Sequence, residues 1–373
     1  MINQFLKKTD FVIVGAGFYG CTMAERIATI LKKRVVIIEA REHIGGNAYS
    51  YKDQTTGIEI HRYGSHIFHT NSEKVWTYIN QFTKFNQYTH KVFSVSNNKL
   101  YSLPFSLLTL SQVYGKVFTP SEAEAKFQNN LVSKKTNFED FAIESVGKEL
   151  YELLIKGYTQ KQWQQDPKEL PAEIIARLPI RFNYDNRYFH DIYQGIPVDG
   201  YGSIFENMLE SKNIVVINNT DFHALNYDFA KPVIYTGPID SFYKYKYGYL
   251  NWRTLDFENQ IINKKDFQGN AVINYPDLNV PYTRIHEYKH FDEKFLDTEK
   301  TLISKEFSRK AEPDDEPYYP VNLQQDRLIL SKYRNIRTNN VHFGGRLATY
   351  KYLDMHMAIA SALQNFENLQ RGF

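Results

Sequence analysis

The sequence predicts an α/β fold in which a Rossmann-like dinucleotide-binding domain is interrupted by a helical insertion and by an antiparallel β-sheet domain. Three observations predict this fold. Short apolar strands followed by glycine turns occur near both ends of the chain and are typical of a Rossmann-like domain. A helical pattern punctuated by prolines occupies the middle, and alternating β-rich runs lie on either side of it.

The first predicted strand is Phe11–Val14, and its four apolar residues indicate a strand buried on both faces. The turn Gly15-Ala-Gly17-Phe-Tyr-Gly20 follows and opens a helix. Glycines at this spacing let backbone amides at the helix start approach a pyrophosphate closely. This stretch therefore predicts a dinucleotide site.

A second buried strand ends in Glu39, about 19 residues after the third glycine, where an acid can bind an adenosine ribose. Ala40 follows, and Gly45, Gly46 and Asn47 come a few residues later. Paired glycines allow the backbone to approach a ligand, as in FAD-binding chains of this kind. We interpret the cofactor as FAD rather than NAD.

Residues 58–70 alternate like a strand and then break at Gly64, which delivers His66 and His69 into a loop. Two histidines three residues apart raise the alternative of a metal site. No third ligand is spaced to join them, so we expect no metal and interpret the rings as hydrogen-bonding groups near a flavin. The segment Asn71-Ser72-Glu73 is expected to cap a helix that runs to about Phe82.

Residues 91–101 predict a hairpin that turns at Asn97-Asn98, outside the nucleotide fold. A helical region follows and extends to about Leu178, with helices starting near Ser121 and Asn137. Gly157 and Pro167 are expected to interrupt helix near its end.

We therefore expect Tyr158 and Trp163 to lie near a loop, with a tryptophan that packs on a helix end as the alternative. Arg177 and Arg181 follow and bring two guanidinium groups near the same loop.

The rest of the chain returns to the first domain. A helix after Gly200 leads to a strand at 214–217, and a further buried strand at 233–235 ends in Thr-Gly237 beside the cofactor. Runs at 271–275, 283–288 and 301–307 predict more antiparallel sheet, which carries Arg253, Asn274 and Arg284. The strand at 341–343, a glycine turn and a helix that starts near Asp354 close the fold.

These assignments divide the chain into parts of three domains. The expected boundaries are 1–82, 195–239 and 326–373 for the FAD-binding domain, 83–103, 179–194 and 240–325 for the sheet domain, and 104–178 for the helical domain with a substrate loop.

Composition excludes several function classes. The 373 residues include 45 basic and 42 acidic residues, so a net charge of +3 gives no general attraction to nucleic acid or to a membrane surface. The single cysteine, Cys21, excludes an internal disulfide and a cysteine-based metal cluster. No apolar run is long enough to span a bilayer, and we expect a cytoplasmic protein without membrane insertion.

Beyond the nucleotide fingerprint, seven further motifs span nearly the whole chain: His61–Thr70, Leu154–Trp163, Gly195–Gly200, Val280–Arg284, Glu316–Pro320, Gly344–Leu347 and Tyr350–Asp354. With these motifs in this order, the chain closely resembles the UDP-galactopyranose mutase family.

The resemblance implies an isomerase that interconverts UDP-galactopyranose and UDP-galactofuranose, supplying galactofuranose for cell-surface polysaccharide such as lipopolysaccharide. It implies FAD that is active when reduced, whose N5 attacks the anomeric carbon as UDP leaves. The expected partners are UDP-galactose and an external reductant, and a homodimer is one option for assembly.

The resemblance also implies roles for individual residues. Trp163 would stack on uracil beside Tyr158, Asn274 would lie near the uridine, and His66 would support the flavin. The diphosphate would be bound by Arg177, Arg284, Tyr188, Tyr319 and Tyr352. We expect catalytic roles for Arg177, Arg284, His66, Tyr319 and Tyr352, and substrate binding by Tyr158, Trp163, Tyr188, Asn274, Arg253 and Asn86.

The expected cofactor-binding residues come from every part of the Rossmann-like domain. They are Gly15, Gly17, Phe18, Gly20, Glu39, Ala40, Gly46, Asn47, His66, Ile67, Gly237, Arg346, Tyr352, Asp354 and Met355.

Three positions depart from the family pattern: Ser65 replaces a small residue that is often alanine, Gln164-Gln165 replaces a glycine-led turn, and Leu154 replaces an aromatic residue of some members. Three alternatives stay open. The chain could be an FAD oxidoreductase of the amine-oxidase type, a non-catalytic UDP-sugar- or flavin-binding protein, or a mutase that accepts UDP-N-acetylgalactosamine.

Overall fold

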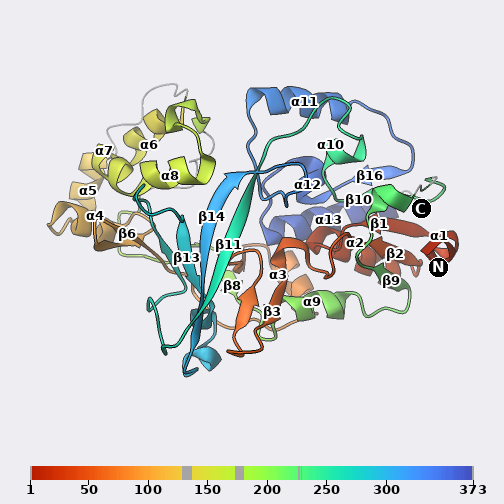
Figure 1. Ribbon diagram of the computed structural model, residues 1–373, viewed down its shortest axis with the longest axis horizontal. Helices are drawn as coiled ribbons and strands as arrows, with labels where there is room; N and C mark the ends of the chain where they lie inside the picture. The colour runs from red at the N-terminus through yellow and green to blue at the C-terminus, as the bar shows by residue number, and fades with distance from the viewer. Residues whose placement is uncertain (1, 128–136, 173–179, 226, 228, 372–373) are drawn as a thin grey trace.

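The computed structural model describes residues 2–127, 137–172, 180–225, 227 and 229–371. Figure 1 shows the molecule as three regions in a row: helices α4 to α8 at one end, a twisted sheet around β11 and β14 in the middle, and an α/β region that contains both chain ends. Among the helices described, none combines the length and the apolar character needed to cross a membrane.

The helices of the α/β region are α1 (Ile2–Lys8), α2 (Phe18–Thr29), α3 (Glu73–Ile79), α9 (Gly200–Met208), α10 (Ile239–Phe242), α11 (Gln324–Arg334), α12 (Gly345–Thr349) and α13 (Met355–Gln370). The helical region contains α4 (Leu107–Tyr114), α5 (Pro120–Phe127), α6 (Phe138–Val146), α7 (Lys148–Leu150), the π-helical turn η3 (Tyr151–Ile155) and α8 (Lys156–Trp163).

The strands are β1 (Phe11–Val14), β2 (Val35–Ile38), β3 (Ser50–Lys52), β4 (Glu59–His61), β5 (Phe68–Thr70), β6 (Val92–Ser96), β7 (Lys99–Leu103), β8 (Tyr193–Gly195), β9 (Ile214–Ile217), β10 (Val233–Tyr235), β11 (Trp252–Ile262), β12 (Val272–Asn274), β13 (Arg284–Glu287), β14 (Thr301–Lys310), β15 (Tyr319–Pro320) and β16 (Val341–Phe343).

Within the described residues the α/β region is built on a parallel sheet of order β16-β10-β1-β2-β9. Both faces are covered, as the continuous apolar strands predict. Ile13 and Ile37 point into a core with α2, α9 and α13, whereas Val12 and Val36 point into the opposite core. The predicted Rossmann-like strands are confirmed.

The second large sheet has the order β15-β11-β14-β13-β12-β6-β7 in the part of the chain that is described. The predicted hairpin is correct: β6 and β7 join at Asn97 and Asn98, whose φ angles are 50° and 58°. The prediction of a purely antiparallel sheet is wrong in one place, because β6 pairs with β12 in parallel.

Four elements of the structure differ from the sequence prediction. The sequence analysis identified no strand over the length of β11 and no helix at α1 or α11. Tyr158 was expected near a loop, but it lies within α8, which continues through Gly157, whereas Trp163 ends α8 directly before the turn at Gln164, as expected. Gly157 serves another purpose there: an ideal Cβ at this position would lie 2.2 Å from the carbonyl oxygen of Pro276. The glycine therefore permits close packing and does not end the helix.

Candidate active site

Two glycine turns form a cradle at the carboxyl end of the parallel sheet. Gly15 has a φ of +96°, and an ideal Cβ there would lie 2.1 Å from Thr236 Oγ1. Gly46 has a φ of +56°, and its ideal Cβ would lie 3.2 Å from the Cα of Gly17. A side chain at either position would collide with the neighbouring segment. Glycine therefore lets these turns pack closely, with backbone rather than side chains facing a ligand.

Polar groups beside the cradle fit a dinucleotide. The carboxylate of Glu39 is buried and accepts hydrogen bonds from the amides of Ala16 at 2.7 Å and Arg41 at 2.9 Å. Arg41 donates through Nη2 to Asn47 Oδ1 at 2.7 Å. Arg41 Nη1 and Asn47 Nδ2 are buried donors that have no acceptor among the described residues. Phosphate and ribose oxygens would supply the missing acceptors.

The other predicted cofactor residues in the first half of the chain differ in burial and in the elements that carry them. Phe18 begins α2, but its ring packs in the core against Phe205 at 4.6 Å between centroids, which leaves its backbone amide for a ligand. Gly20 lies in the first turn of the same helix. Ala40 is exposed just after β2, and Ile67 is buried before β5.

The remaining members come from the second half of the chain. Gly237 follows β10, and Asp354 is the N-cap residue of α13, which begins at Met355. Arg346 donates hydrogen bonds to the carbonyl oxygens of Tyr318 at 2.5 Å and Pro317 at 3.2 Å.

His66 has a defined tautomer. Its Nδ1 lies 2.7 Å from the carbonyl oxygen of Gly64, which can only accept, so Nδ1 carries the proton and Nε2 is an acceptor. Burial lowers the pKa of His66 to about 4, so the ring is neutral at pH 7. A neutral imidazole beside a flavin can exchange hydrogen bonds without adding charge.

The reason given for excluding a metal near His66 and His69 is wrong. His69 Nδ1 lies 2.8 Å from Asp191 Oδ2. The first turn of α13 also brings Asp354 and His356 near His69, and one ligand atom of each of these three residues lies within 4.8 Å of the others. These residues come from the other end of the chain, so spacing along the sequence gave no sign of them. The absence of a metal stays a prediction.

Arg284 is the centre of the candidate substrate site. It begins β13 directly opposite Glu306 of β14, and its Nε lies 3.2 Å from Glu306 Oε1. The Arg284 side chain retains 26% exposure, whereas that of Glu306 retains 2%. Arg284 Nη2 also donates to the hydroxyl of Tyr158. The guanidinium therefore has a buried counterion on one side and a partly open face on the other.

A chain of polar contacts runs from the ion pair of Arg284 and Glu306 to the loop of His66. Glu306 Oε2 accepts from His286 Nε2 at 3.0 Å, and His286 Nδ1 lies 2.5 Å from Ser65 Oγ. Burial lowers the pKa of His286 despite the neighbouring Glu306, so the ring is neutral. Ser65 must then donate to Nδ1. Burial opposes ionisation of Glu306, but Arg284 and His286 outweigh it and hold the pKa of that carboxyl below its usual value.

Tyrosine hydroxyls surround the guanidinium. Arg284 interacts electrostatically with Tyr158, Tyr319 and Tyr188. Tyr319 stacks on Tyr352 with a centroid distance of 5.8 Å. Burial raises the pKa of Tyr158 to about 12 and that of Tyr319 well above its usual value. Both phenols therefore stay protonated at neutral pH and can donate to anionic oxygens.

The predicted base-binding residues come from β12 and α8. Asn274 ends β12 opposite Arg284 in the sheet register, and its buried Oδ1 has no donor among the described residues. Trp163 ends α8 and packs against the apolar core of the helical region.

Two predicted substrate residues are engaged elsewhere. Arg253 Nε donates to the carbonyl of Gln162 at 3.0 Å and its Nη2 to Ser308 Oγ at 3.2 Å, so this guanidinium fixes the end of α8. Asn86 Oδ1 accepts from two backbone amides and its Nδ2 donates to Phe291 O. Neither side chain joins the group around Arg284. Arg177 lies outside the described residues.

Known proteins resemble this chain over nearly its whole length. The sequence model of the UDP-galactopyranose mutase family matches residues 153–352, and a model of an NAD(P)-binding Rossmann-like domain matches residues 13–82. A probable UDP-galactopyranose mutase of Klebsiella pneumoniae is 42% identical over 365 residues, covering 96% of this chain and 94% of that protein. A dTDP-fucopyranose mutase of Escherichia coli is 41% identical over 364 residues, covering 95% and 96% respectively.

Among solved structures, reduced UDP-galactopyranose mutase superimposes with a TM-score of 0.76 at 14% identity, covering 98% of this chain and 94% of its own. That likeness supports the predicted fold class. The sequence relationships establish more than the fold: this chain belongs to the UDP-galactopyranose mutase family.

Proposed function

We propose that this protein is an isomerase that interconverts UDP-galactopyranose and UDP-galactofuranose, with FAD as its cofactor. The observation that carries the proposal is Arg284 of β13, a partly open guanidinium that interacts with the protonated hydroxyls of Tyr158 and Tyr319. A diphosphate fits such a group of cationic and neutral donors. The product would supply galactofuranose for cell-surface polysaccharide.

FAD would be held by the glycine turns at Gly15 and Gly46, with Glu39 at the ribose and the buried donors of Arg41 and Asn47 facing oxygens. When bound and reduced, it supplies the nucleophile for the anomeric carbon of the sugar. His66 contributes a neutral ring with an Nε2 acceptor. An external reductant is required to keep the cofactor reduced.

The side chains around Arg284 would act on the leaving group. When the bond between the anomeric carbon and the phosphate oxygen breaks, UDP retains both electrons and its negative charge grows. Arg284 and the hydroxyls of Tyr158 and Tyr319 would stabilise that charge. The bond between the anomeric carbon and the original ring oxygen would then break, and that oxygen would take up a proton. Another hydroxyl of the sugar would lose a proton and form the new ring bond before the anomeric carbon recaptures UDP, so no atoms or electrons are gained or lost overall.

A second candidate substrate is a dTDP-6-deoxy sugar. The Escherichia coli dTDP-fucopyranose mutase is nearly as similar to this chain as the Klebsiella pneumoniae protein is. Thymine differs from uracil by one methyl group, which hydrophobic contact discriminates only weakly. UDP-N-acetylgalactosamine is a further substrate to be compared in the same assay.

The test is anaerobic incubation of dithionite-reduced protein with UDP-galactofuranose, followed by chromatographic separation of the two UDP-galactose forms. We expect UDP-galactopyranose to accumulate, and the fully oxidised protein to be much slower. Parallel incubations with dTDP-fucofuranose and with the furanose form of UDP-N-acetylgalactosamine rank the substrates. Oxidation of the sugar with net reduction of FAD would instead indicate an oxidoreductase, and binding without conversion would indicate a non-catalytic protein.

A further inference from the structure

We propose that Lys161 is a positioning residue that fixes α8 to the turn between β12 and β13, and so holds the nucleotide-binding side chains of both segments in one arrangement. This inference rests on the proposed function, because it assigns Lys161 to the binding of the same UDP-sugar.

The ammonium group of Lys161 is surrounded by backbone oxygens of the turn formed by residues 275–283. Lys161 Nζ lies within hydrogen-bond distance of four carbonyl oxygens, those of Tyr275, Asp277 at 3.0 Å, Val280 at 2.9 Å and Tyr282 at 2.9 Å, which share its three protons. A cation that donates to carbonyls from successive parts of one turn fixes the path of that turn. No acidic side chain takes part in these hydrogen bonds, so the contact depends on the path of the backbone through the turn.

Gly157 provides a second, independent contact on the same face of α8. It lies four residues before Lys161, so both positions face the same neighbour. An ideal Cβ at Gly157 would lie 2.2 Å from Pro276 O and 3.3 Å from the carbonyl carbon. The helix backbone thus packs directly on the turn, with Lys161 fixing the other end of the contact.

The two joined segments carry predicted nucleotide-binding residues. Tyr158 and Trp163 lie on α8, and Asn274 is the last residue of β12, immediately before the turn. Arg284 follows the turn and also donates to Tyr158 on α8, but its cross-strand pairing with Glu306 in β14 does not depend on Lys161. Loss of Lys161 should therefore disturb Trp163 and Asn274, which are predicted to face the nucleotide, more than Arg284, which is predicted to face the leaving group.

The decisive variant is Lys161→Met, which keeps the length of the side chain and removes its donors. We expect UDP to bind the reduced protein at least roughly tenfold more weakly and KM to rise in parallel. Turnover at saturating substrate should fall less than UDP affinity, because Arg284 keeps its pairing with Glu306 even if Tyr158 moves with α8. A protein that is merely less well folded would lose turnover per total enzyme while KM stayed constant.

Three further variants sharpen the test. Lys161→Arg retains a cation with several donors and should recover part of the lost affinity. Gly157→Ala should weaken UDP binding in the same way by forcing α8 away from Pro276, and it carries the test if Lys161→Met does not fold. Lys156→Met is the matched control, because Lys156 pairs with Glu152 on the surface of the helical region, and we expect it to leave UDP affinity unchanged.

Hydrogen exchange separates this inference from the proposed function. In Lys161→Met the amides of residues 277–280, 282 and 283 should exchange faster than in the parent, with or without nucleotide. If the parent neither binds UDP nor isomerises UDP-galactose, the proposed function fails, and the Lys161 contact is then judged on exchange alone. Unchanged UDP affinity in a folded Lys161→Met protein overturns the proposal, as does unchanged exchange of the turn.

Discussion

At the scale of single residues, the charge on Arg284 is already compensated by buried Glu306. Arg284→Ala therefore removes the cation at the leaving group and also leaves a buried carboxylate without its partner. We expect turnover at saturating UDP-galactofuranose to fall by about 10²- to 10³-fold, as when other transition-state donors are lost, and UDP to bind more weakly. Steady-state kinetics of the reduced enzyme and a UDP titration measure the two effects.

The matched control is Arg284→Lys, which keeps a positive charge near Glu306 but cannot donate from a planar fork. Its folding should resemble that of the parent while turnover remains low. Normal saturated turnover in Arg284→Ala would contradict the role of this residue at the leaving group.

Trp163 combines two predicted functions, because the structure packs it on the helical core and the family pattern assigns it to the base. Trp163→Ala should weaken UDP binding by roughly 1–3 kcal/mol through lost stacking, with a smaller effect on saturated turnover. It should also lower the melting temperature, since a partly buried indole is truncated. Titration with UDP and thermal unfolding measure these effects separately.

Trp163→Phe serves as the control, since it retains an aromatic ring and should restore most of the UDP affinity. A lower melting temperature without any change in UDP affinity would leave Trp163 with a packing role alone.

The residues of the site were predictable to different degrees. Arg284, Tyr158 and Tyr319 belong to motifs that the sequence displays, and the structure brings them together. The hydrogen bonds that link Ser65, His286 and Glu306 depend on sheet register and loop placement, which a single sequence does not specify. The alternation of β13 places Arg284 and His286 on one face, and this was the available signal. Lys161 was missed because its partners are backbone atoms.

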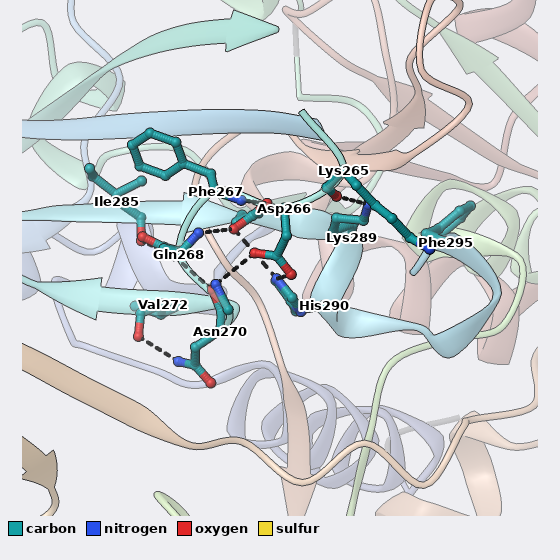
Figure 2. A network of polar contacts seen from close by, with 12 residues as sticks. Lys265, Asp266, Phe267, Gln268, Asn270, Val272, Ile285, Lys289, His290 and Phe295 are labelled. Carbon is teal, nitrogen blue, oxygen red and sulfur yellow. Dashed lines mark hydrogen bonds and ion pairs between the residues drawn. The ribbon is translucent and has the colours of Figure 1, made fainter. Parts of the chain in front are cut away.

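At the scale of elements, a polar network fixes the loop before β12 to the end of β13 (Figure 2). Glu287 is fully buried and accepts from the amides of Phe267 at 3.0 Å and Gln268 at 2.8 Å. His290 Nε2 lies 3.2 Å from Asp266 Oδ2 and 3.4 Å from Glu287 Oε2. These three residues are also close enough to offer one ligand atom each to a metal.

This network predicts a pH-dependent contribution to stability. Burial opposes the charged imidazole, but Glu287 and Asp266 outweigh it and raise the pKa of His290 above its usual 6.5. A raised pKa in the folded state means that the contribution is full below pH 6.5 and disappears as the pH rises through the folded value. We expect His290→Gln to destabilise the protein by on the order of 1 kcal/mol near pH 5.5 and by less near pH 8.5.

Thermal unfolding of the parent and of His290→Gln across this pH range provides the measurement. His342→Gln is the control, because His342 is exposed on β16. A melting-temperature difference that stays constant, or that grows with pH, would show that His290 contributes by packing alone.

Elements were predicted best where burial is uniform. The strands β1, β2 and β10 are apolar throughout because helices cover both faces of their sheet, and the sequence displays them directly. Strand β11 was missed because its second half, from Asp256 onward, is largely exposed and polar. Helix α8 was misjudged because Gly157 has a low helix propensity, while the contact with Pro276 that requires glycine is remote in sequence.

At the scale of the whole molecule, the cofactor should be bound without a covalent link. The sole cysteine, Cys21, is fully buried in α2 and its thiol donates to the carbonyl of Ala16 at 3.1 Å. We expect acid or heat denaturation of the yellow protein to release all flavin into the supernatant as FAD, measured by absorbance and chromatography. Flavin that remains with the precipitated chain would refute this, as would NAD in the supernatant.

The parallel sheet joins segments that are far apart along the chain, since β1 lies between β2 and β10 while β16 completes the edge (Figure 1). During synthesis β1 and β2 emerge first, and their apolar residues must wait for partners translated much later. The helical region relies on nearer contacts and can fold in the interval. The apolar face of the sheet that α13 covers therefore stays exposed until residues 355–370 have left the ribosome. Until then, the nascent polypeptide has no complete binding site for its cofactor.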